Sequence, residues 1–190
     1  MWEWLVELDQ QIFTYINGSY FNRFDVFWLF VTRLETWLPL YITFFILLIV
    51  KLPKRLNYIA SLTVIIATLT AIGLTDLVKN AVARLRPNNE PILLDSINIL
   101  QRPENFSFWS GHTAVSMTVS LLMFLILNNY NKSKWWLLFF IWPLLFATSR
   151  IFVGVHYPLD VLVGALVGLF LGAAFYKLLM NLFNRLQHTT

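Results

Sequence analysis

The stretch SRIFVGVHYPLD, from Ser149 to Asp160, decides how this chain can fold. It separates two long apolar runs, residues 134–154 and 158–182, each long enough to cross a membrane. One membrane span therefore ends, and the next begins, within a short crossing that carries an arginine, a histidine and an aspartate. Charged side chains are costly at such a place, so those that are present usually have a function.

The order of residues in this crossing favours a contact between His156 and Asp160. Pro158 suits the first turn of a helix, so Asp160 falls within that turn. From there its carboxylate can reach the His156 ring, fix its tautomer and stabilise its protonated form. A histidine held in this way can act as a nucleophile or a general base. The plainer alternatives are an ordinary first-turn acid at Asp160 and a helix C-terminal cation at Arg150.

The composition is that of a polytopic membrane protein. Of 190 residues, 58% are hydrophobic, and only 14 are Lys or Arg and 10 are Asp or Glu; the mean hydropathy is +0.64. We expect one membrane domain over residues 1–190. The absence of cysteine excludes disulfides, thiolate metal sites and cysteine nucleophiles. The N-terminus lacks the basic region and cleavage site of a signal peptide, so we expect nothing to be removed.

The N-terminal part is expected to lie at the membrane surface. Residues 2–16 mix apolar and acidic side chains in the pattern of an amphipathic interfacial helix, which Asn17-Gly18 ends, so residues 1–20 form this segment. The next apolar piece, residues 21–34, is interrupted by Arg23, Asp25 and Arg33. It is either a half-span or the outer end of the first transmembrane helix.

The core spans are expected within residues 36–182, in an all-α bundle of five to six transmembrane helices. Residues 36–50 carry no charge and nearly suffice to cross a hydrocarbon core of ~30 Å. Pro143 predicts a kink in one later span. Three glycines in the last span predict close helix packing: Gly164, Gly168 and Gly172. Four further spans are expected at residues 56–84, 112–129, 134–154 and 158–182.

The charges indicate how the spans are oriented. The ends on one side carry basic residues and no acid: Lys51, Lys54, Arg55, Lys132, Lys134, Lys177 and Arg185. All ten acids fall on the opposite side or in the N-terminal region. By the positive-inside rule the acid-free side is cytoplasmic. The His156 side then faces the periplasm or cell exterior, in what we expect to be a bacterial inner membrane.

A second polar cluster runs from Lys79 to Pro87, at the end of the span at 56–84. Seven residues make about two helical turns, so Lys79 and Arg86 are expected on one helical face, about 10 Å apart, with Pro87 ending the helix. Two cations at a membrane boundary suit an anionic head group. Snorkelling of the side chains to the interface explains them equally well, and it is the better explanation for Arg84.

A third polar cluster, Ser110-Gly111-His112, opens the span at 112–129. Free N–H groups at a helix start bind anions, and a glycine lets a phosphate approach the backbone. Taken alone, Ser110 would equally be an ordinary N-cap, and His112 a structural histidine.

The coincidence of these clusters on one side favours a phosphate site. Two of the three histidines, His112 and His156, lie at outer span ends beside Lys79, Arg86 and Arg150; the third, in the polar tail, is expected to be inert. One histidine can attack phosphorus and the other can protonate the departing oxygen. Because no carboxylate cluster suggests a magnesium or calcium site, the cations must take the place of a metal.

Together the three clusters resemble the signature of the type 2 phosphatidic acid phosphatase superfamily, which vanadium haloperoxidases and some soluble acid phosphatases share. The resemblance covers residues 70–165 by motif and the remaining spans by architecture. Each motif is weak alone, but all three in order, on separate spans and one face, are specific. The motif K-x6-R-P is matched by Lys79, Arg86 and Pro87, P-S-G-H by Ser110, Gly111 and His112, and S-R-x5-H-x3-D by Ser149, Arg150, His156 and Asp160.

The resemblance implies a metal-independent phosphatase that forms a phosphohistidine intermediate and needs no cofactor. By matching position, His156 would be the nucleophile and Asp160 its orienting partner. His112 would be the general acid for the leaving group and then the base that activates water. The implied phosphate-binding residues are Lys79, Arg86, Ser110, Gly111 and Arg150, and no metal ligand is implied.

Two features lie outside the motifs proper. Trp109 stands where the family motif has proline, so we expect altered loop geometry rather than altered chemistry. For its side chain we expect a place in the interfacial aromatic belt, with a lipid or head-group contact as the alternative. The long connection at residues 88–108 is predicted to border the substrate entrance and to influence head-group choice; a passive surface connection is the alternative.

We therefore expect an all-α membrane enzyme that removes a terminal phosphate from a lipid phosphate or diphosphate at the outer leaflet. The substrates that the resemblance suggests are undecaprenyl diphosphate, phosphatidylglycerol phosphate, phosphatidic acid and lipid A. A lipid phosphotransferase with the same intermediate, and a non-catalytic lipid-phosphate binding or transport protein, are the alternatives. The expected partners are the lipid phosphate and the bilayer, with no nucleic acid and no obligate protein partner.

Overall fold

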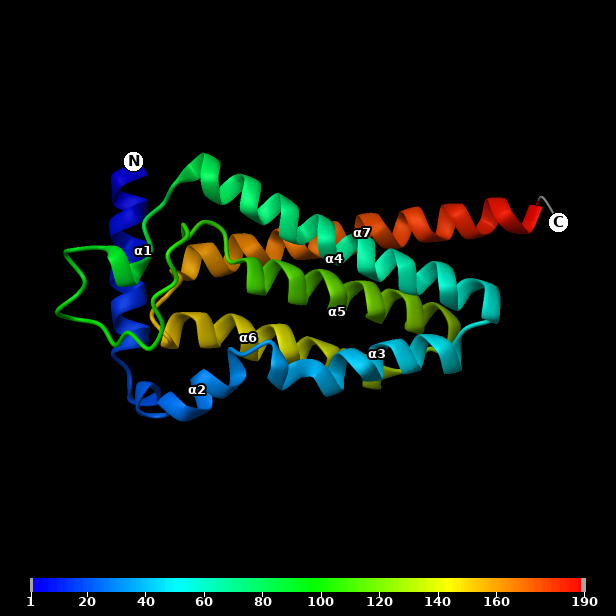
Figure 1. The fold of residues 1–190 in the computed structure, drawn as a ribbon, viewed down its shortest axis with the longest axis horizontal. Coiled ribbons are helices and arrows are strands. Elements are labelled where there is room, and N and C mark those ends of the chain that lie inside the picture. Colours follow the sequence, from blue (N-terminus) through cyan, green and yellow to red (C-terminus); the bar gives the residue numbers. More distant parts are fainter. Residues whose placement is uncertain (1, 189–190) are drawn as a thin grey trace.

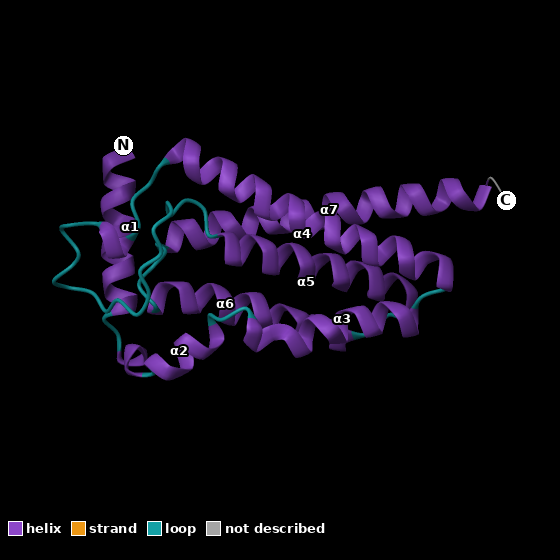
Figure 2. Cartoon of the chain, viewed as in Figure 1, coloured by secondary structure: helices purple, strands orange, loops and turns teal. Residues whose placement is uncertain are grey.

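Long helices and their connections make up the whole of residues 2–188, the range that the computed structural model describes, and no β-strand occurs in this range (Figure 1, Figure 2). The predicted all-α class is therefore confirmed. In chain order the helices are α1 (Trp2–Asn17), η1 (Tyr20–Arg23), α2 (Asp25–Val31), η2 (Glu35–Trp37), α3 (Leu38–Lys51), α4 (Lys54–Val82), η3 (Pro87–Asn89), α5 (Gly111–Tyr130), η4 (Lys134–Phe140), α6 (Ile141–Phe152) and α7 (Pro158–His188).

Four helical segments of the described range are long and apolar enough to cross a membrane: α4, α5, η4 with α6, and α7. A fifth span results if α2 and the segment Glu35–Lys51, which bend by 67° at their break, count as one. The protein is thus an integral membrane protein with four or five spans. The sixth span is not found, because α2 has only seven residues and rises about 10 Å, far less than the ~30 Å of a hydrocarbon core.

The kink predicted at Pro143 stays a prediction, while the helix type of this span changes just before that residue. The span starts as the 3-10 helix η4 and continues as α6 from Ile141. Pro143 therefore sits in the first turn of α6, where a missing backbone N–H is tolerated.

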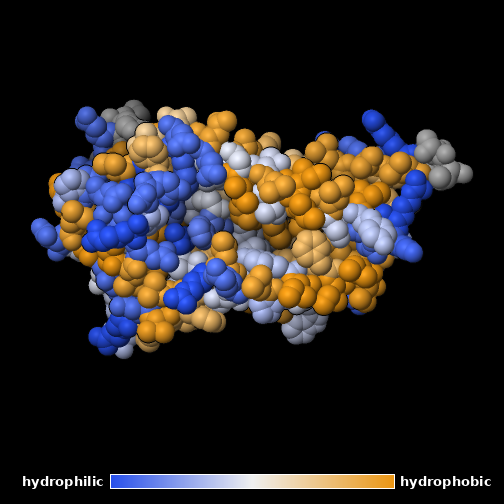
Figure 3. Space-filling view, viewed as in Figure 1, coloured by the Kyte–Doolittle hydropathy of each residue, from blue (hydrophilic) through white to orange (hydrophobic). Residues whose placement is uncertain are grey.

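Helix α5 forms the centre of the bundle, between α4, α6 and α7 (Figure 1). In its most apolar window 61% of the residues are buried, against 28% for α4 and for α7. On the face seen in Figure 3, hydrophobic side chains gather over the half of the bundle that lies away from α1. Buried hydroxyls on α5 bond to backbone carbonyls, as polar groups in a span must: Thr118 donates to Ala114 O (2.8 Å) and Ser120 to Phe139 O (3.0 Å).

The glycine stripe of α7 packs directly on α5, as predicted. A Cβ at Gly164 would lie 2.6 Å from Ser110 O, and a Cβ at Gly168 would lie 2.6 Å from Ala114 O. Side chains at these positions would force the helices apart. Small residues therefore permit the close approach on which helix association in a membrane depends.

The connection of residues 83–110 covers one end of the bundle, where α1 lies across the ends of the long helices (Figure 1). This end is also the more hydrophilic one in the view of Figure 3. The connection is anchored rather than loose. Leu100 N donates to Val153 O (3.1 Å), and Asn98 N donates to Oδ1 of Asn17 (2.8 Å), the residue that ends α1 as predicted.

Candidate active site

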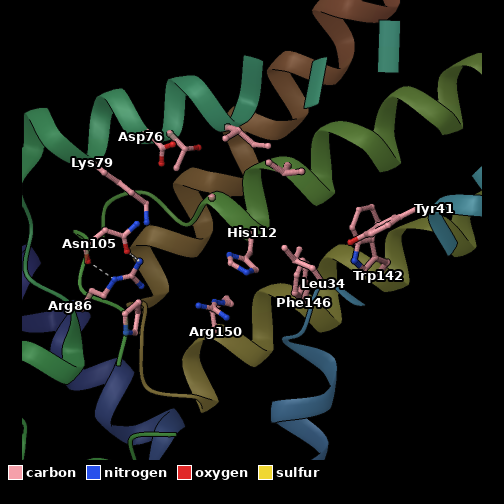
Figure 4. A pocket seen from close by; sticks show the side chains of 15 residues that line it. Leu34, Tyr41, Asp76, Lys79, Arg86, Asn105, His112, Trp142, Phe146 and Arg150 are labelled. Carbon is pink, nitrogen blue, oxygen red and sulfur yellow. Dashed lines mark hydrogen bonds between the residues drawn. The ribbon is translucent and has the colours of Figure 1, made fainter. Parts of the chain in front are cut away.

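A cavity of about 400 Å³ lies between α3, α4, α5 and α6 at the covered end of the bundle (Figure 4). One end is polar, with Asn105 among the cations, and the other is formed by Leu34, Tyr41, Trp142 and Phe146. The structure brings five of the eight predicted site residues into the lining: Lys79, Arg86, Gly111, His112 and Arg150. The other three, Ser110, His156 and Asp160, are buried and do not line it.

Lys79 and Arg86 do not meet in the way their spacing predicted. Helix α4 ends at Val82, and Ala83 adopts a left-handed conformation (φ 51°, ψ 34°) that turns the chain away from the helix axis. Arg86 is therefore not two turns along the same helical face, and Pro87 does not end the helix. The reversal at Ala83 could not be foreseen, because alanine rarely adopts positive φ.

The connection of residues 83–110 instead carries Arg86 to the cavity and supplies hydrogen-bond acceptors to both cations. Lys79 Nζ donates to Phe106 O (3.0 Å). Arg86 donates from Nε to Asn105 O (2.7 Å) and from Nη2 to Asn105 Oδ1 (2.6 Å). Pro103 and Asn105 also line the cavity, so the segment 88–108 borders it, and its influence on head-group choice stays a prediction.

His156 lies against the polar end of the cavity through Arg86. Arg86 Nη1 is 3.1 Å from Nε2 of the ring, which is 1% exposed. Because a guanidinium only donates, Nε2 must accept, and the neutral ring then carries its proton on Nδ1. Burial, and after it the nearby Arg86 and Arg150, hold the pKa of His156 well below its usual value. The ring is therefore neutral and presents an unprotonated Nε2.

Asp160 faces the opposite edge of this ring, as the spacing predicted. Its Oδ2 lies 3.4 Å from His156 Nδ1 and accepts the backbone N–H of Tyr157 (3.0 Å) and the Ser107 hydroxyl. Its Oδ1 accepts from Arg84 Nη1 (2.8 Å). Arg84, which was expected at the membrane interface, and Ser107 were not predicted to belong to the site. No sequence signal marks either residue, since both reach the site through the fold of the connection.

Arg150 and His112 face the cavity from α6 and α5 (Figure 4). Arg150 donates through Nη1 to the Thr32 hydroxyl and to Gln101 Oε1 (3.3 Å), while its Nε has no partner among residues 2–188. The His112 ring packs edge-on against Phe146 (4.9 Å between ring centres). In the described part of the chain neither nitrogen of His112 has a hydrogen-bond partner, so the ring is free to exchange a proton with a ligand.

Residues 109–111, at the start of α5, contact the first turn of α5 and the neighbouring helix α4. Ser110 is the N-cap, but its side chain does not cap the helix; its Oγ accepts from the Thr113 hydroxyl (3.0 Å). A Cβ at Gly111 would lie 2.9 Å from Thr75 Cγ2, so glycine permits the close contact with α4. Trp109 ties the connection to α4, because its indole N–H donates to Thr75 Oγ1 (2.9 Å).

Comparisons with known proteins agree with the motifs. A sequence model described as "PAP2 superfamily" matches residues 59–184. Over its whole length the chain is 30% identical to a lipid A 4'-phosphatase from Bacteroides thetaiotaomicron, 85% of which is covered. An undecaprenyl-diphosphatase from Sulfolobus acidocaldarius is 30% identical over 83% of this chain and 72% of its own.

A solved structure supports the same relationship. The crystal structure of LpxE from Aquifex aeolicus superposes with a TM-score of 0.64 at 28% identity, over 90% of this chain and 95% of that one. The matched residues 59–184 include all three polar clusters. The chain therefore belongs to the PAP2 superfamily, the family of type 2 phosphatidic acid phosphatases that the motifs predicted.

Proposed function

We propose that the protein is a lipid phosphatase that removes a terminal phosphate through a phosphohistidine intermediate at the extracytoplasmic face. One observation carries the proposal: three buried cations share one cavity, and the single acid among its lining residues, Asp76, is exposed and forms an ion pair with none of them. Lys79, Arg86 and Arg150 are 5%, 3% and 4% exposed and line the same cavity. None of them forms an ion pair with an acid anywhere in the described chain. Buried charges need compensation, and a phosphate dianion supplies it.

The shape of the cavity fits a lipid that carries such a phosphate. Its polar end holds the three cations, Asp76 and His112, and its other end is lined by Leu34, Tyr41, Trp142 and Phe146 (Figure 4). A phosphate among the cations would place the attached chain along these apolar side chains. The cavity lies between spans, so the substrate can remain in the bilayer while its head group reacts.

In the first half of the proposed reaction, Nε2 of His156 attacks phosphorus as the bond to the leaving oxygen breaks. Arg86 transfers its hydrogen bond from Nε2 to a phosphoryl oxygen, and Lys79 and Arg150 stabilise the charge on the others. Asp160 stabilises the ring as it becomes positive, through Nδ1–H. His112 donates its proton to the departing oxygen.

In the second half, His112 removes a proton from water as that water attacks phosphorus. The Nε2–P bond breaks, and its electron pair returns to His156. The products are inorganic phosphate and the neutral ring, so the residues recover their starting protonation states.

The relatives support an order among the candidate lipids. Proteins named lipid A 4'-phosphatase and undecaprenyl-diphosphatase are both similar to this chain. We place lipid A first, because that relative is matched over the full length of the chain. Undecaprenyl diphosphate comes second, and phosphatidylglycerol phosphate and phosphatidic acid follow.

Phosphate release by the purified protein in detergent, with chelator present, tests the proposal on these four lipids. The wild-type protein should release phosphate, and His156→Ala should lose at least about a thousandfold in rate because the nucleophile is gone. Equal release by His156→Ala would exclude the phosphohistidine. Phosphorylation of an added lipid acceptor in place of release would indicate a phosphotransferase, and lipid movement that survives His156→Ala would indicate a transporter.

A further inference from the structure

Helix α1 carries a buried carboxylate that is directed at the candidate active site. Asp9 is 5% exposed and lies outside residues 59–184, the part that matches the family. Its Oδ2 accepts from Arg84 Nη2 (2.7 Å), and its Oδ1 accepts the backbone N–H of Leu159 (2.8 Å). Both contacts lead to Asp160, because Arg84 also binds that carboxylate and Leu159 precedes it in the chain.

Arg84 joins the two carboxylates through separate nitrogens. Its Nη1 donates to Asp160 Oδ1 (2.8 Å), while Nη2 serves Asp9. The guanidinium also lies over the Tyr157 ring (4.0 Å to the ring centre). Arg84 follows the end of α4 and belongs to no helix, so these contacts determine where its side chain lies. The planar guanidinium of arginine can bind two carboxylates through two separate nitrogens, whereas a lysine has a single ammonium group.

The contact with Leu159 places the backbone from which Asp160 projects. Leu159 is the second residue of α7, and its N–H belongs to the first turn, which has no partner within the helix. Asp9 accepts this N–H as an N-cap side chain would, but from another helix. Asp9 thus holds the turn that carries Asp160, and it also holds Arg84, which binds Oδ1 of Asp160. The other oxygen of Asp160, Oδ2, is left facing His156.

We infer that Asp9 and Arg84 are positioning residues that aim the Asp160 carboxylate at His156, and that α1 is therefore part of the catalytic apparatus. This inference rests on the proposed function. Neither Asp9 nor Arg84 lines the cavity. Their loss should lower kcat and leave KM nearly unchanged, because substrate binding does not involve them.

The test measures phosphate release by Asp9→Asn, Arg84→Gln and the double variant. Asparagine keeps the size of Asp9 and can still accept from Leu159, but it repels Arg84 with its own donor. We expect Asp9→Asn to lower kcat about tenfold, as small misplacements of catalytic groups do, with KM within about twofold. The double variant should resemble Arg84→Gln alone, because Asp9→Asn keeps the contact with Leu159 and disturbs only the contact with Arg84. Glu3→Gln, an exposed change of the same charge on the same helix, is the control.

Two results would overturn the inference: an unchanged kcat in Asp9→Asn, or effects of the two substitutions that simply multiply. If Asp9→Asn does not fold, Arg84→Lys replaces it; full activity of that variant would show that bridging two carboxylates is unnecessary, and a tenfold loss would support the bridge.

A second readout does not depend on activity. The NMR signal of the His156 Nδ1 proton, assigned among three histidines by substitution, moves upfield when its hydrogen bond to Asp160 weakens. We expect such a shift in Asp9→Asn, or in Arg84→Lys where that variant replaces it, and none in Glu3→Gln; an unmoved signal refutes the positioning role. If the wild-type protein releases no phosphate, the proposed function fails, while this signal still decides whether Asp9 aims Asp160.

Discussion

The His156 imidazole lies between a guanidinium at Nε2 (3.1 Å) and a carboxylate at Nδ1 (3.4 Å). The two neighbours do not act equally on its charge. Asp160 is shared with Arg84 and Ser107, so part of its negative charge is already compensated. Burial and Arg86 therefore lower the pKa of His156 more than Asp160 can raise it, and the ring stays neutral. A neutral ring is what nucleophilic attack requires.

This balance predicts how stability depends on pH. The pKa of His156 in the folded protein is lowered from about 6.5, so the unfolded chain binds its proton more readily. The stability that the neutral ring contributes is present above pH 6.5 and is lost as the pH falls from there toward the folded pKa. The variant His156→Gln has no titrating group at this position, so it does not lose this contribution to stability as the pH falls. Between pH 7.5 and 5.5 the unfolding temperature of the wild-type protein should fall relative to that of His156→Gln; a constant difference would contradict the lowered pKa.

Sequence reasoning at this scale succeeded for local contacts and failed for distant ones. The contact of His156 with Asp160 follows from a spacing of four residues at a helix start, so it could be predicted. The contact of Arg84 with Asp160 spans 76 residues and depends on the left-handed turn at Ala83. Alanine gives no indication of a left-handed turn, so α4 was expected to continue past residue 83. On a continuing helix Arg84 would lie at the membrane interface, to which it was therefore assigned.

At the scale of helices, the contact between α5 and α7 positions the site, because these helices carry His112 and Asp160. Gly168→Ala places a Cβ 2.6 Å from a backbone oxygen of α5, which cannot move aside alone. We expect a loss of about 1–3 kcal/mol in stability, measured as a lower unfolding temperature in detergent. Gly73→Ala is the matched control, because its Cβ would meet nothing within 4 Å. Equal effects of both substitutions would show that close packing is not the cause.

Most helix bounds were predicted to within a few residues, because a membrane span needs a long apolar run; α7 is the exception, since it runs on to His188. The expected spans at 112–129 and 158–182 correspond to α5 and α7. The connection of residues 83–110 could not be predicted in the same way. Its course depends on partners far away in the sequence, such as Asn17 and Val153, and the same connection binds Lys79 and Arg86 through Phe106 and Asn105.

Across the whole molecule, the two ends of the bundle differ in charge. The turn between α3 and α4 and the C-terminal ends of α5 and α7 lie at the end opposite α1 (Figure 1). They carry the acid-free group of basic residues defined above. This arrangement supports a cytoplasmic position for that end and an extracytoplasmic position for the cavity.

Cysteine labelling tests the orientation, because the natural chain contains no cysteine. Asp95 is exposed in the connection near the cavity, and Lys132 is exposed at the opposite end. In spheroplasts a membrane-impermeant maleimide should label Asp95→Cys, but should label Lys132→Cys only after the membrane is permeabilised. The reverse pattern would place the cavity in the cytoplasm.

The hydrogen bond from Arg86 engages the same lone pair of His156 that would form the bond to phosphorus. An uncharged electrophile has no anionic oxygen that could accept the hydrogen bond of Arg86. The guanidinium then stays on Nε2, and the lone pair of that nitrogen is not available to attack. A phosphate has anionic oxygens that can accept this hydrogen bond from Arg86 in place of Nε2. The lone pair of Nε2 would then be free to attack phosphorus. In the proposed reaction, His156 would therefore become reactive only when a phosphate is bound, so selectivity for phosphorylated molecules would begin before any bond is made or broken.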